Sequence, residues 1–170
     1  MKTFKLLLTA TFMSFVILGC GEEKKEKESF TYERKSSSTK TKKEDDNLAN
    51  IVLTADDLMK YNTNEIKVKA GQKVRLTLRH IGKLDKNVMG HNIVILNKDV
   101  DMVAFATQAA TQKENDYIPV GTSDVLAHTN MIGGGQTTTI EFDAPEVGIY
   151  DFLCSFPAHY AMMKGKFIVE

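Results

Sequence analysis

The chain has 170 residues, which suits one domain with additional segments rather than two full domains. It carries 22 basic and 22 acidic residues, so its formal net charge is zero, and nothing in it is basic enough to indicate a nucleic-acid surface. Only two cysteines occur, Cys20 and Cys154. The composition therefore excludes nucleic acid as an expected partner, and the role of each cysteine has to be explained.

Residues 1–19 have the pattern of a secretory signal that ends at a lipidation site. Lys2 and Lys5 precede an apolar stretch that is too short for a convincing membrane-spanning helix. The letters ILGC at its end resemble a bacterial lipobox, in which the signal is cut before the cysteine and the thiol takes a diacylglycerol. An ordinary signal peptide that happens to contain a cysteine is the alternative. We expect an exported protein anchored to a membrane through Cys20. Because Gly21 is not an inner-membrane retention residue, the periplasmic face of the outer membrane is favoured, with the cell surface as the alternative.

Residues 20–46 are predicted to be a disordered, charged tether that begins at the lipidated cysteine. From residue 21 to residue 46, eight acidic and eight basic residues cancel, and no apolar periodicity is present. Such a segment cannot bury enough apolar surface to offset its chain entropy. The remaining residues, 47–170, carry 12 basic and 14 acidic side chains and are expected to form the folded domain.

The domain has the pattern of an all-β protein with one inserted helix. Residues 73–80, KVRLTLRH, alternate between apolar and polar positions, whereas residues 91–96, HNIVIL, are apolar on both faces and predict a central strand. Residues 100–113 contain alanines and glutamines after a possible cap at Asp99 or Asp101, and they predict the helix. Short strands separated by turns favour an antiparallel sandwich or barrel. Further strands are expected at 49–54, 65–70, 137–142, 148–154 and 166–170.

The loop CSFPAHYAMMKGK, residues 154–166, brings together Cys154, His159 and Met163 between two predicted strands. A nucleophile with its base, a metal site and an inert buried thiol are three interpretations of this pattern. No third orienting group is apparent for a nucleophile. Copper suits the three donors, because Cu(I) favours sulfur and Cu(II) accepts nitrogen, and the blue-copper arrangement needs one more histidine. Zinc is the alternative metal, but a thioether is a poor zinc ligand.

The segment KNVMGHNIVIL supplies the second histidine, His91, at the start of the most apolar strand. Gly90 has no Cβ, so its carbonyl can approach closely, and Asn92 is placed to join the two loops by hydrogen bonds. If Cys20 is lipidated, Cys154 is a lone thiol in an oxidising compartment, where a bound metal would explain it. His80, on an apolar strand face, is interpreted as a hydrogen-bonded core histidine.

These segments resemble the azurins, the bacterial blue-copper members of the cupredoxins. NVMGHN and CSFPAHYAMMKG are similar to their two ligand segments, and LAHTNMIGGG is similar to the strand and loop between them. The resemblance covers about residues 47–170. It implies a cupredoxin-like Greek-key β-sandwich or barrel. It also implies a protein that carries single electrons by Cu(I)/Cu(II) cycling and is not an enzyme.

The resemblance also implies roles for individual residues. His91, Cys154 and His159 would be equatorial copper ligands, with Met163 as a weak axial ligand and the Gly90 carbonyl as a longer axial contact. Around the cysteine sulfur, Asn92 and the amide of Phe156 would form hydrogen bonds. A cytochrome or a respiratory oxidoreductase would dock on an apolar patch around His159, formed by Leu84, Val88, Met89, Pro157 and Ala158.

The chain departs from the azurin pattern at several positions. Leu48 and Gly71 stand where azurins usually have a disulfide, and Ile93 replaces a common tryptophan. Ala158 stands in place of a glycine before the second histidine, and Tyr160 in place of a serine after it. A copper-delivery protein is the alternative function. The chain lacks the exposed Met-rich or His-rich runs expected of such a protein, so an electron carrier is favoured.

Overall fold

The computed structural model describes residues 47–170. The predicted signal peptide, the lipidation site at Cys20 and the predicted tether lie outside these residues. Within the described part of the chain, no helix has the length and apolar character needed to cross a membrane.

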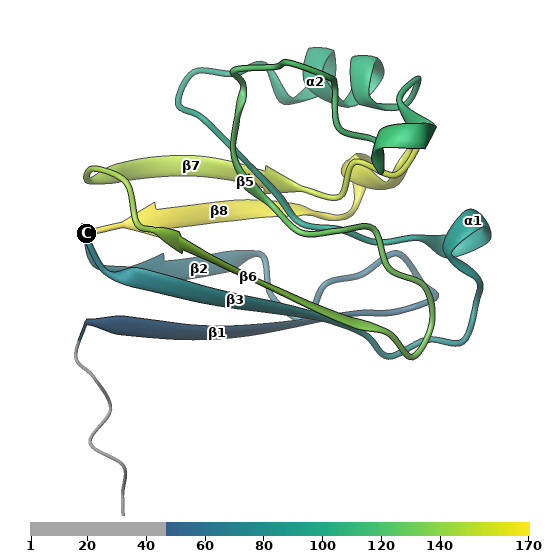
Figure 1. Ribbon diagram of the computed structural model, residues 1–170, viewed down its shortest axis with the longest axis horizontal. Helices are drawn as coiled ribbons and strands as arrows, with labels where there is room; N and C mark the ends of the chain where they lie inside the picture. Colours follow the sequence, from purple (N-terminus) through teal and green to yellow (C-terminus); the bar gives the residue numbers. More distant parts are fainter. Residues whose placement is uncertain (1–46) are drawn as a thin grey trace, which may run out of the picture. The chain divides into compact units, whose positions relative to one another are not determined.

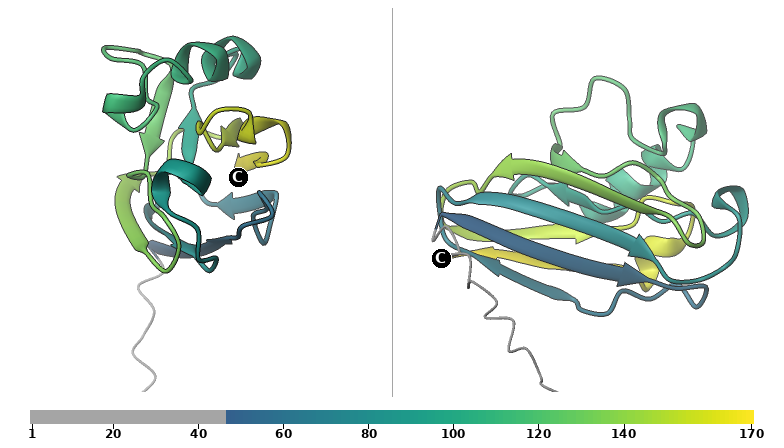
Figure 2. Two further views of the ribbon diagram at one scale, coloured as in Figure 1. Left: turned by 90° about the vertical axis from the view of Figure 1, so that its right-hand side faces the viewer. Right: turned by 60° about the horizontal axis from the view of Figure 1, so that its bottom comes forward.

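The described residues form two packed β-sheets (Figures 1 and 2). The three-stranded sheet has the order β1 (Leu48–Ala55), β3 (Lys73–His80), β6 (Thr137–Asp143). The five-stranded sheet has the order β2 (Glu65–Val68), β8 (Lys164–Val169), β7 (Gly148–Leu153), β4 (Val94–Leu96), β5 (Val125–His128). The all-β sandwich predicted from the sequence is confirmed. Two α-helices and two 3-10 helices lie in the connections: α1 (Lys86–Met89), α2 (Met102–Ala109), η1 (Lys113–Asn115) and η2 (His159–Ala161).

Alternating side chains on β3 explain how the two sheets pack. Val74, Leu76 and Leu78 are fully buried, and the intervening residues are exposed or half-buried. The buried face meets side chains of the five-stranded sheet, including Phe152 and Phe167. Burial of each such side chain contributes about 1.5–3 kcal/mol to folding. The core between the sheets therefore fixes which ends of the strands lie together.

The expectation of antiparallel strand pairing is wrong for two strand pairs, although the sandwich itself is confirmed. β1 pairs with β3 in parallel, and β2 pairs with β8 in parallel. The reason is that β2, which lies between β1 and β3 in the sequence, belongs to the other sheet. The chain therefore crosses between the sheets and returns, so that β1 and β3 run in the same direction and end side by side at Ala55 and His80.

The inserted helix explains why β4 is apolar on both faces. Phe105, Ala106 and Ala109 of α2 pack against Val94 and Leu96, on the face of β4 that does not meet the other sheet. The helix is shorter than the predicted 100–113. It begins after Asp101, whose side chain accepts hydrogen bonds from two amides of the first turn.

The helix ends at Ala109 because its last turn tightens. The amide and the hydroxyl of Thr111 both donate to the Gln108 carbonyl, at 3.2 and 2.8 Å, in place of the regular helical bond. The 3-10 helix η1 and a left-handed residue, Asp116, then turn the chain back toward the sheet.

Candidate metal centre

The predicted ligand segments meet at one end of the sandwich, on the right in Figure 1. His91 lies between α1 and β4. Its backbone amide and carbonyl each form a 2.9 Å hydrogen bond with Ile132, in the loop after β5. In that loop, the Gly134 amide donates to the Leu84 carbonyl at 2.8 Å and the Gly135 amide to the His80 carbonyl at 2.9 Å. The segment LAHTNMIGGG therefore supports the backbone on both sides of His91.

Cys154 directly follows β7 and begins a loop that closes on itself. Its amide donates to the Met163 carbonyl at 2.9 Å, and the Met163 amide donates to the His159 carbonyl at 2.7 Å. The side chains of Cys154 and Met163 are fully buried, and His159 is 4% exposed. The backbone of the loop therefore holds the thiol, the imidazole and the thioether at the edge of the core.

Three donor side chains converge at this end. The Sγ atom of Cys154 lies 3.7 Å from Nδ1 of His159 and 3.9 Å from Nδ1 of His91. All three donor atoms lie within 4.8 Å of one another, and all three residues are buried. The Gly90 carbonyl oxygen lies 3.8 Å from the same sulfur. A soft sulfur and two imidazole nitrogens at this spacing fit a single copper ion.

The two histidines differ in what their second nitrogen meets. Nε2 of His91 lies 2.8 Å from the Asp56 carbonyl oxygen, so it carries the proton and donates, which leaves the lone pair of Nδ1 directed at the site. Nε2 of His159 has no hydrogen-bond partner among the described residues. In those residues every fully buried side-chain nitrogen or oxygen has a partner, so Nε2 of His159 is not fully buried. The free edge of His159 therefore reaches the solvent.

Burial keeps the donor side chains uncharged without a metal. It raises the pKa of the Cys154 thiol to about 11, against the opposing effect of the nearby Asn92 and Phe156 amides and the Tyr61 hydroxyl. It also lowers the pKa of His159 to about 4 and moves the pKa of His91 below its usual value. A fully buried thiol with a raised pKa is a poor nucleophile, which argues against the catalytic-cysteine interpretation. Metal binding would release the thiol proton.

Asn92 joins the two ligand segments, as its position in the sequence suggested. Its side-chain amide donates to the Ser155 hydroxyl at 2.8 Å, and the Ser155 amide donates back to its side-chain oxygen at 2.9 Å. A further bond of 3.3 Å runs to the Asp116 carbonyl. The side chains of Asn92 and Ser155 are buried, so these bonds are shielded from water. Sequence reasoning missed Ser155, because a serine in a loop carries no distinguishing pattern.

Tyr61 and His80 also support the site from outside the ligand segments. The Tyr61 hydroxyl, which sequence reasoning missed, donates to the Asn92 carbonyl. His80 is the expected core histidine: Nε2 lies 2.9 Å from the Met89 carbonyl, and Nδ1 accepts from the Gly82 amide at 3.0 Å. Its ring stacks on that of His91, with centroids 4.4 Å apart. No local pattern could reveal these contacts, because each joins residues that are brought together by the fold.

Gly90 is required for a steric reason beyond the one expected. A glycine lets its own carbonyl approach the site, and the Gly90 carbonyl oxygen lies 3.8 Å from Sγ of Cys154. A Cβ at this position would lie 2.4 Å from the Lys86 carbonyl oxygen and 3.0 Å from both Met131 and Phe156. Gly90 therefore allows the end of α1 to pack directly against the loop that carries the cysteine.

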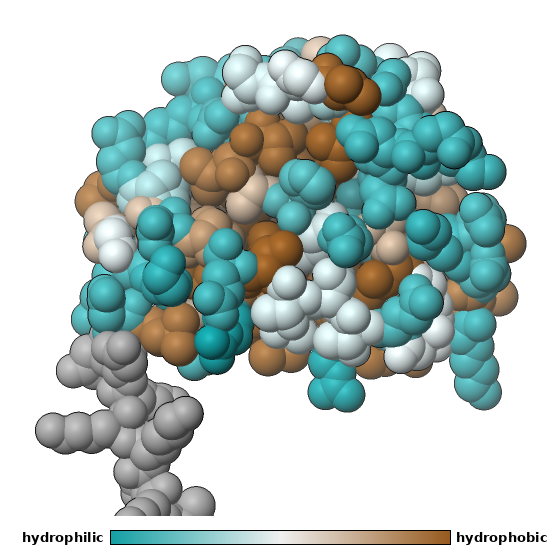
Figure 3. Space-filling model, in the orientation of Figure 1, coloured by the Kyte–Doolittle hydropathy of each residue, from teal (hydrophilic) through white to brown (hydrophobic). Residues whose placement is uncertain are grey.

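The predicted apolar patch residues lie on α1, on the segment before it and on the cysteine loop. Leu84 and Val88 are exposed, Met89 and Pro157 are half-buried, and Ala158 is exposed. Met162, at 58% exposed, extends the surface, and we call these six residues the apolar patch. At the right-hand end of the molecule in Figure 3, hydrophobic and hydrophilic side chains lie next to one another.

Ala158 has a backbone conformation that favours glycine. Its φ is 67° and its ψ is −11°, in the left-handed region that residues with a Cβ rarely adopt. It caps η2, which contains His159. Tyr160, the other departure in this loop, packs partly buried against the cluster beneath α2.

Comparisons with known proteins match this fold and site. The family model for copper binding proteins of the plastocyanin/azurin family matches residues 48–170. Azurin-2 of Alcaligenes xylosoxydans xylosoxydans is 42% identical over 118 residues, which cover 66% of this chain and 91% of that protein. Azurin of Pseudomonas chlororaphis is 42% identical over 119 residues, 67% of this chain and 92% of that protein.

Solved structures are similar over nearly their whole length. An azurin, Az-iso2, of Methylomonas sp. strain J has a TM-score of 0.65 and 30% identity, and the match covers 72% of this chain and 98% of that one. Auracyanin of Roseiflexus castenholzii has a TM-score of 0.65 and 33% identity, with 72% and 97% covered. Azurins and other cupredoxins are electron-transfer proteins, not enzymes, and the His91–Cys154–His159 cluster suits one type 1 copper ion. The chain therefore belongs to the plastocyanin/azurin family of copper-binding proteins and is a blue-copper electron carrier.

Proposed function

We propose that the protein is a membrane-anchored carrier of single electrons between redox partners. In this proposal, His91, Cys154 and His159 would hold the copper ion as its principal ligands, Met163 would be a weaker ligand, and the Gly90 carbonyl would make a longer contact. The observation that carries it is the buried cluster in which Sγ of Cys154 lies within 3.9 Å of Nδ1 of both histidines. Copper, when bound, supplies a one-electron couple between Cu(I) and Cu(II).

The way in which the ligands are held favours a carrier over a copper-delivery protein. His91 is fixed by its backbone pairing with Ile132 and by the bond from Nε2 to Asp56, and Cys154 is fixed by its bond to the Met163 carbonyl. Such support restricts ligand movement when the charge of the site changes, which suits rapid electron transfer. Fully buried ligands also slow the loss of the metal, which opposes a role in delivery.

We place the route of the electron through His159. Its ring centroid lies 4.5 Å from that of Phe156, and its Nε2 edge is the part of the ligand set that reaches the solvent. Redox proteins of the cytochrome or respiratory oxidoreductase type would dock over this edge on the apolar patch. The amides of Asn92 and Phe156 near the cysteine sulfur would stabilise the thiolate and so influence the reduction potential.

Membrane anchoring through a lipid on Cys20 is proposed from the sequence alone. Residue 47, where the described chain begins, lies at the end of the sandwich opposite the metal centre (Figure 1). An anchor attached on that side would leave the apolar patch accessible to partners. The signal sequence and Gly21, which is not an inner-membrane retention residue, favour an exported protein on the periplasmic face of the outer membrane, with the cell surface as the alternative.

The electron-carrier proposal is tested by loading the full chain with Cu(II) and recording its visible spectrum. The wild type is expected to show the intense blue charge-transfer absorption of a copper thiolate, and Cys154→Ser is expected to lack it. Cys20→Ser is the matched control, because it removes the other thiol and should leave the colour unchanged. A wild-type chain that binds one copper ion and stays colourless would contradict the proposal. Rapid copper loss to a chelator together with slow electron self-exchange would favour delivery.

Anchoring is tested separately by expression in a bacterium with labelled fatty acid. The wild type is expected to take up the label and to sediment with membranes, and Cys20→Ser is expected to do neither. Unlabelled wild-type protein in the soluble fraction would contradict anchoring and leave the copper assignment intact.

A further inference from the structure

In the described part of the chain, most lysines at the metal-centre end lack a carboxylate partner, whereas most lysines elsewhere have one. Among the described residues, Lys73 pairs with Asp143 at 2.9 Å on the three-stranded sheet, and most other ion pairs lie on the strands or at the opposite end. The one lysine–carboxylate pair at the metal-centre end joins Lys86 and Asp116 at 3.3 Å. Four exposed lysines at this end form no ion pair within residues 47–170, and we call them the lysine rim: Lys60, Lys83, Lys113 and Lys164.

Two sides of the lysine rim border the apolar patch directly. Lys60 and Lys164 line one groove together with the exposed Met162. Lys83 lines a second groove with Leu84. The two grooves belong to different loops, so cationic side chains approach the patch from two directions.

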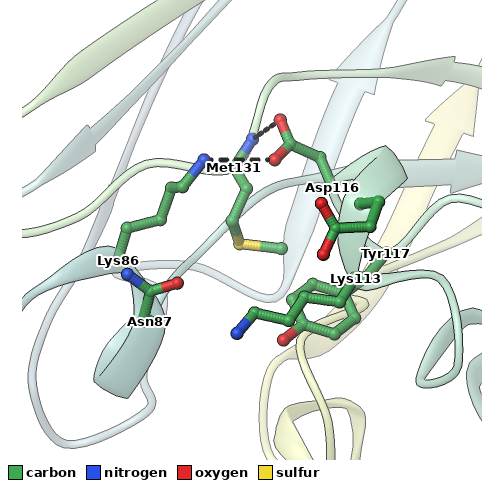
Figure 4. Close-up of a pocket in the computed structure, with 7 residues that line it drawn as sticks. Lys86, Asn87, Lys113, Asp116, Tyr117 and Met131 are labelled. Carbon is green, nitrogen blue, oxygen red and sulfur yellow. Dashed lines mark hydrogen bonds and ion pairs between the residues drawn. The ribbon is translucent and has the colours of Figure 1, made fainter.

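Lys113 lies in a third groove at the metal-centre end, which reaches the patch only through Phe156, the residue before Pro157. It lines this groove with Tyr117 and Met131, and the Tyr117 ring packs against Phe156 with centroids 5.3 Å apart. Figure 4 shows the Lys113 side chain directed away from the Asp116 carboxylate, which is turned toward the Met131 amide. Lys113 therefore forms no ion pair within residues 47–170, although Glu114 lines the same groove.

Most carboxylates at this end are engaged by the main chain. Each of four aspartates accepts hydrogen bonds from main-chain amides, whose dipoles partly compensate the negative charge. Only Glu114 lies exposed there without a bond to the described residues. The aspartates and their donor amides are Asp56 with Leu58 (2.9 Å), Asp57 with Lys83 (2.8 Å), Asp85 with Asn87 (2.8 Å) and Asp116 with Met131 (3.1 Å).

The remaining unpaired cations lie away from the patch. Lys69 is in the turn at the opposite end, and Arg79 is on the exposed face of β3. The domain as a whole carries 12 basic and 14 acidic side chains, so its net charge would not attract anions. The placement of unpaired lysines around the metal-centre end therefore comes from the arrangement of the fold and not from composition.

We propose that the apolar patch and the lysine rim together form a docking face for a redox protein with an apolar centre and a surrounding rim of carboxylates. This inference rests on the proposed function and specifies the chemistry of the partner. Apolar contact would hold the two proteins together at His159, and the lysines would steer and orient the encounter. Since exposed charges act over about a Debye length, roughly 10 Å at 0.1 M salt, the attraction weakens as salt is added.

The test uses the copper-loaded full chain in its reduced form and two small oxidants of opposite charge. These are the hexacyanoferrate(III) anion and the tris(phenanthroline)cobalt(III) cation, and each takes one electron from Cu(I). The rim variant changes all four rim lysines to glutamine. The matched control makes the same change at four lysines away from the patch: Lys67, Lys69, Lys73 and Lys98. Reduction potentials are measured for each variant so that rates can be corrected for driving force.

We expect the rate with hexacyanoferrate(III) to fall about tenfold in the rim variant at low salt and to fall less than about twofold in the control. The rate with the cobalt complex should rise in the rim variant. An acidic cytochrome should react faster than a basic one with the wild type, and the rim variant should lose this preference. Equal effects of the rim and control variants would overturn the inference.

Two further outcomes separate this inference from its alternatives. Vesicles containing phosphatidylglycerol, mixed with the Cys20→Ser chain, test whether the rim instead binds an anionic membrane. Rim-dependent vesicle binding with unchanged oxidation rates would overturn a protein partner. A wild-type chain that is not blue, or that reacts with neither oxidant, contradicts the proposed function itself. A blue chain that reacts with both oxidants at rates independent of salt contradicts only the lysine rim.

Discussion

Replacing Asn92 with alanine is expected to destabilise the copper-free chain more than any single loss of a surface hydrogen bond. The side chain is fully buried, and its oxygen accepts from the Ser155 amide at 2.9 Å while its amide group donates to the Ser155 hydroxyl at 2.8 Å. The bond to the Asp116 carbonyl, at 3.3 Å, is weaker. All three bonds are lost in Asn92→Ala, and water has little access to replace them.

The expected loss of stability is set by the buried polar groups that Asn92→Ala leaves without a partner. The Ser155 amide, in a residue that is 2% exposed, loses its acceptor, and an unsatisfied buried donor costs about 1–3 kcal/mol. The bonds to the hydroxyl and to the carbonyl add about 1 kcal/mol together. We therefore expect the free energy of unfolding to fall by about 3 kcal/mol.

Urea unfolding of the copper-free full chain, followed by circular dichroism, measures this change. Circular dichroism is chosen because the chain has no tryptophan. Asn97→Ala is the matched control: it removes a 2.6 Å bond to the Ser123 carbonyl in an exposed loop, where water replaces the lost donor. The control should lose less than about 1 kcal/mol. If Asn92→Ala loses no more than Asn97→Ala, the view that Asn92 holds the two ligand segments together is refuted.

Three further outcomes are expected. Ala158→Gly should raise the free energy of unfolding by about 0.5 kcal/mol. The reason is that removing the backbone strain of an alanine in the left-handed region outweighs the greater chain entropy of glycine in the unfolded state. A lower melting temperature would contradict this. Burial lowers the pKa of His159 from 6.5 to about 4, so its neutral form stabilises the copper-free fold above pH 6.5. As the pH falls toward 4, the free energy of unfolding should decrease by up to roughly 3 kcal/mol. Urea unfolding at a series of pH values should show a weaker pH dependence for His159→Gln than for the wild type. Equal pH dependence of the two proteins would oppose this. Tyr61→Phe removes the hydroxyl that donates to the Asn92 carbonyl and should cost about 1 kcal/mol. Urea unfolding of the copper-free chain measures this change, and unchanged stability would count against a role for the hydroxyl.

Local patterns predicted the features that depend on neighbouring residues. The alternation in KVRLTLRH placed β3 at Lys73–His80, and one of the two proposed caps, Asp101, begins α2. The loop from Cys154 to Met163 could be predicted as a donor cluster because its residues lie close in sequence and between two strands. His91 could be added only because copper chemistry requires a further nitrogen.

Contacts between distant parts of the chain were decided by the tertiary structure. The parallel pairing of β1 with β3 depends on β2 lying in the other sheet, and the apolar side chains of α2 find their packing partners on β4. The bond between Tyr61 and Asn92 and the stacking of His80 on His91 likewise join separate segments.

The charges of the domain show most clearly which properties come from the sequence and which come from the tertiary structure. The sequence by itself determined that the domain carries slightly more acidic than basic side chains, because composition does not depend on folding. Only the tertiary structure decided that Lys73 meets Asp143, while Lys60 and Lys113 at the metal-centre end meet no carboxylate among the described residues. The physical reason is that an ion pair needs two charges within about 4 Å, and strand pairing and loop packing set those distances.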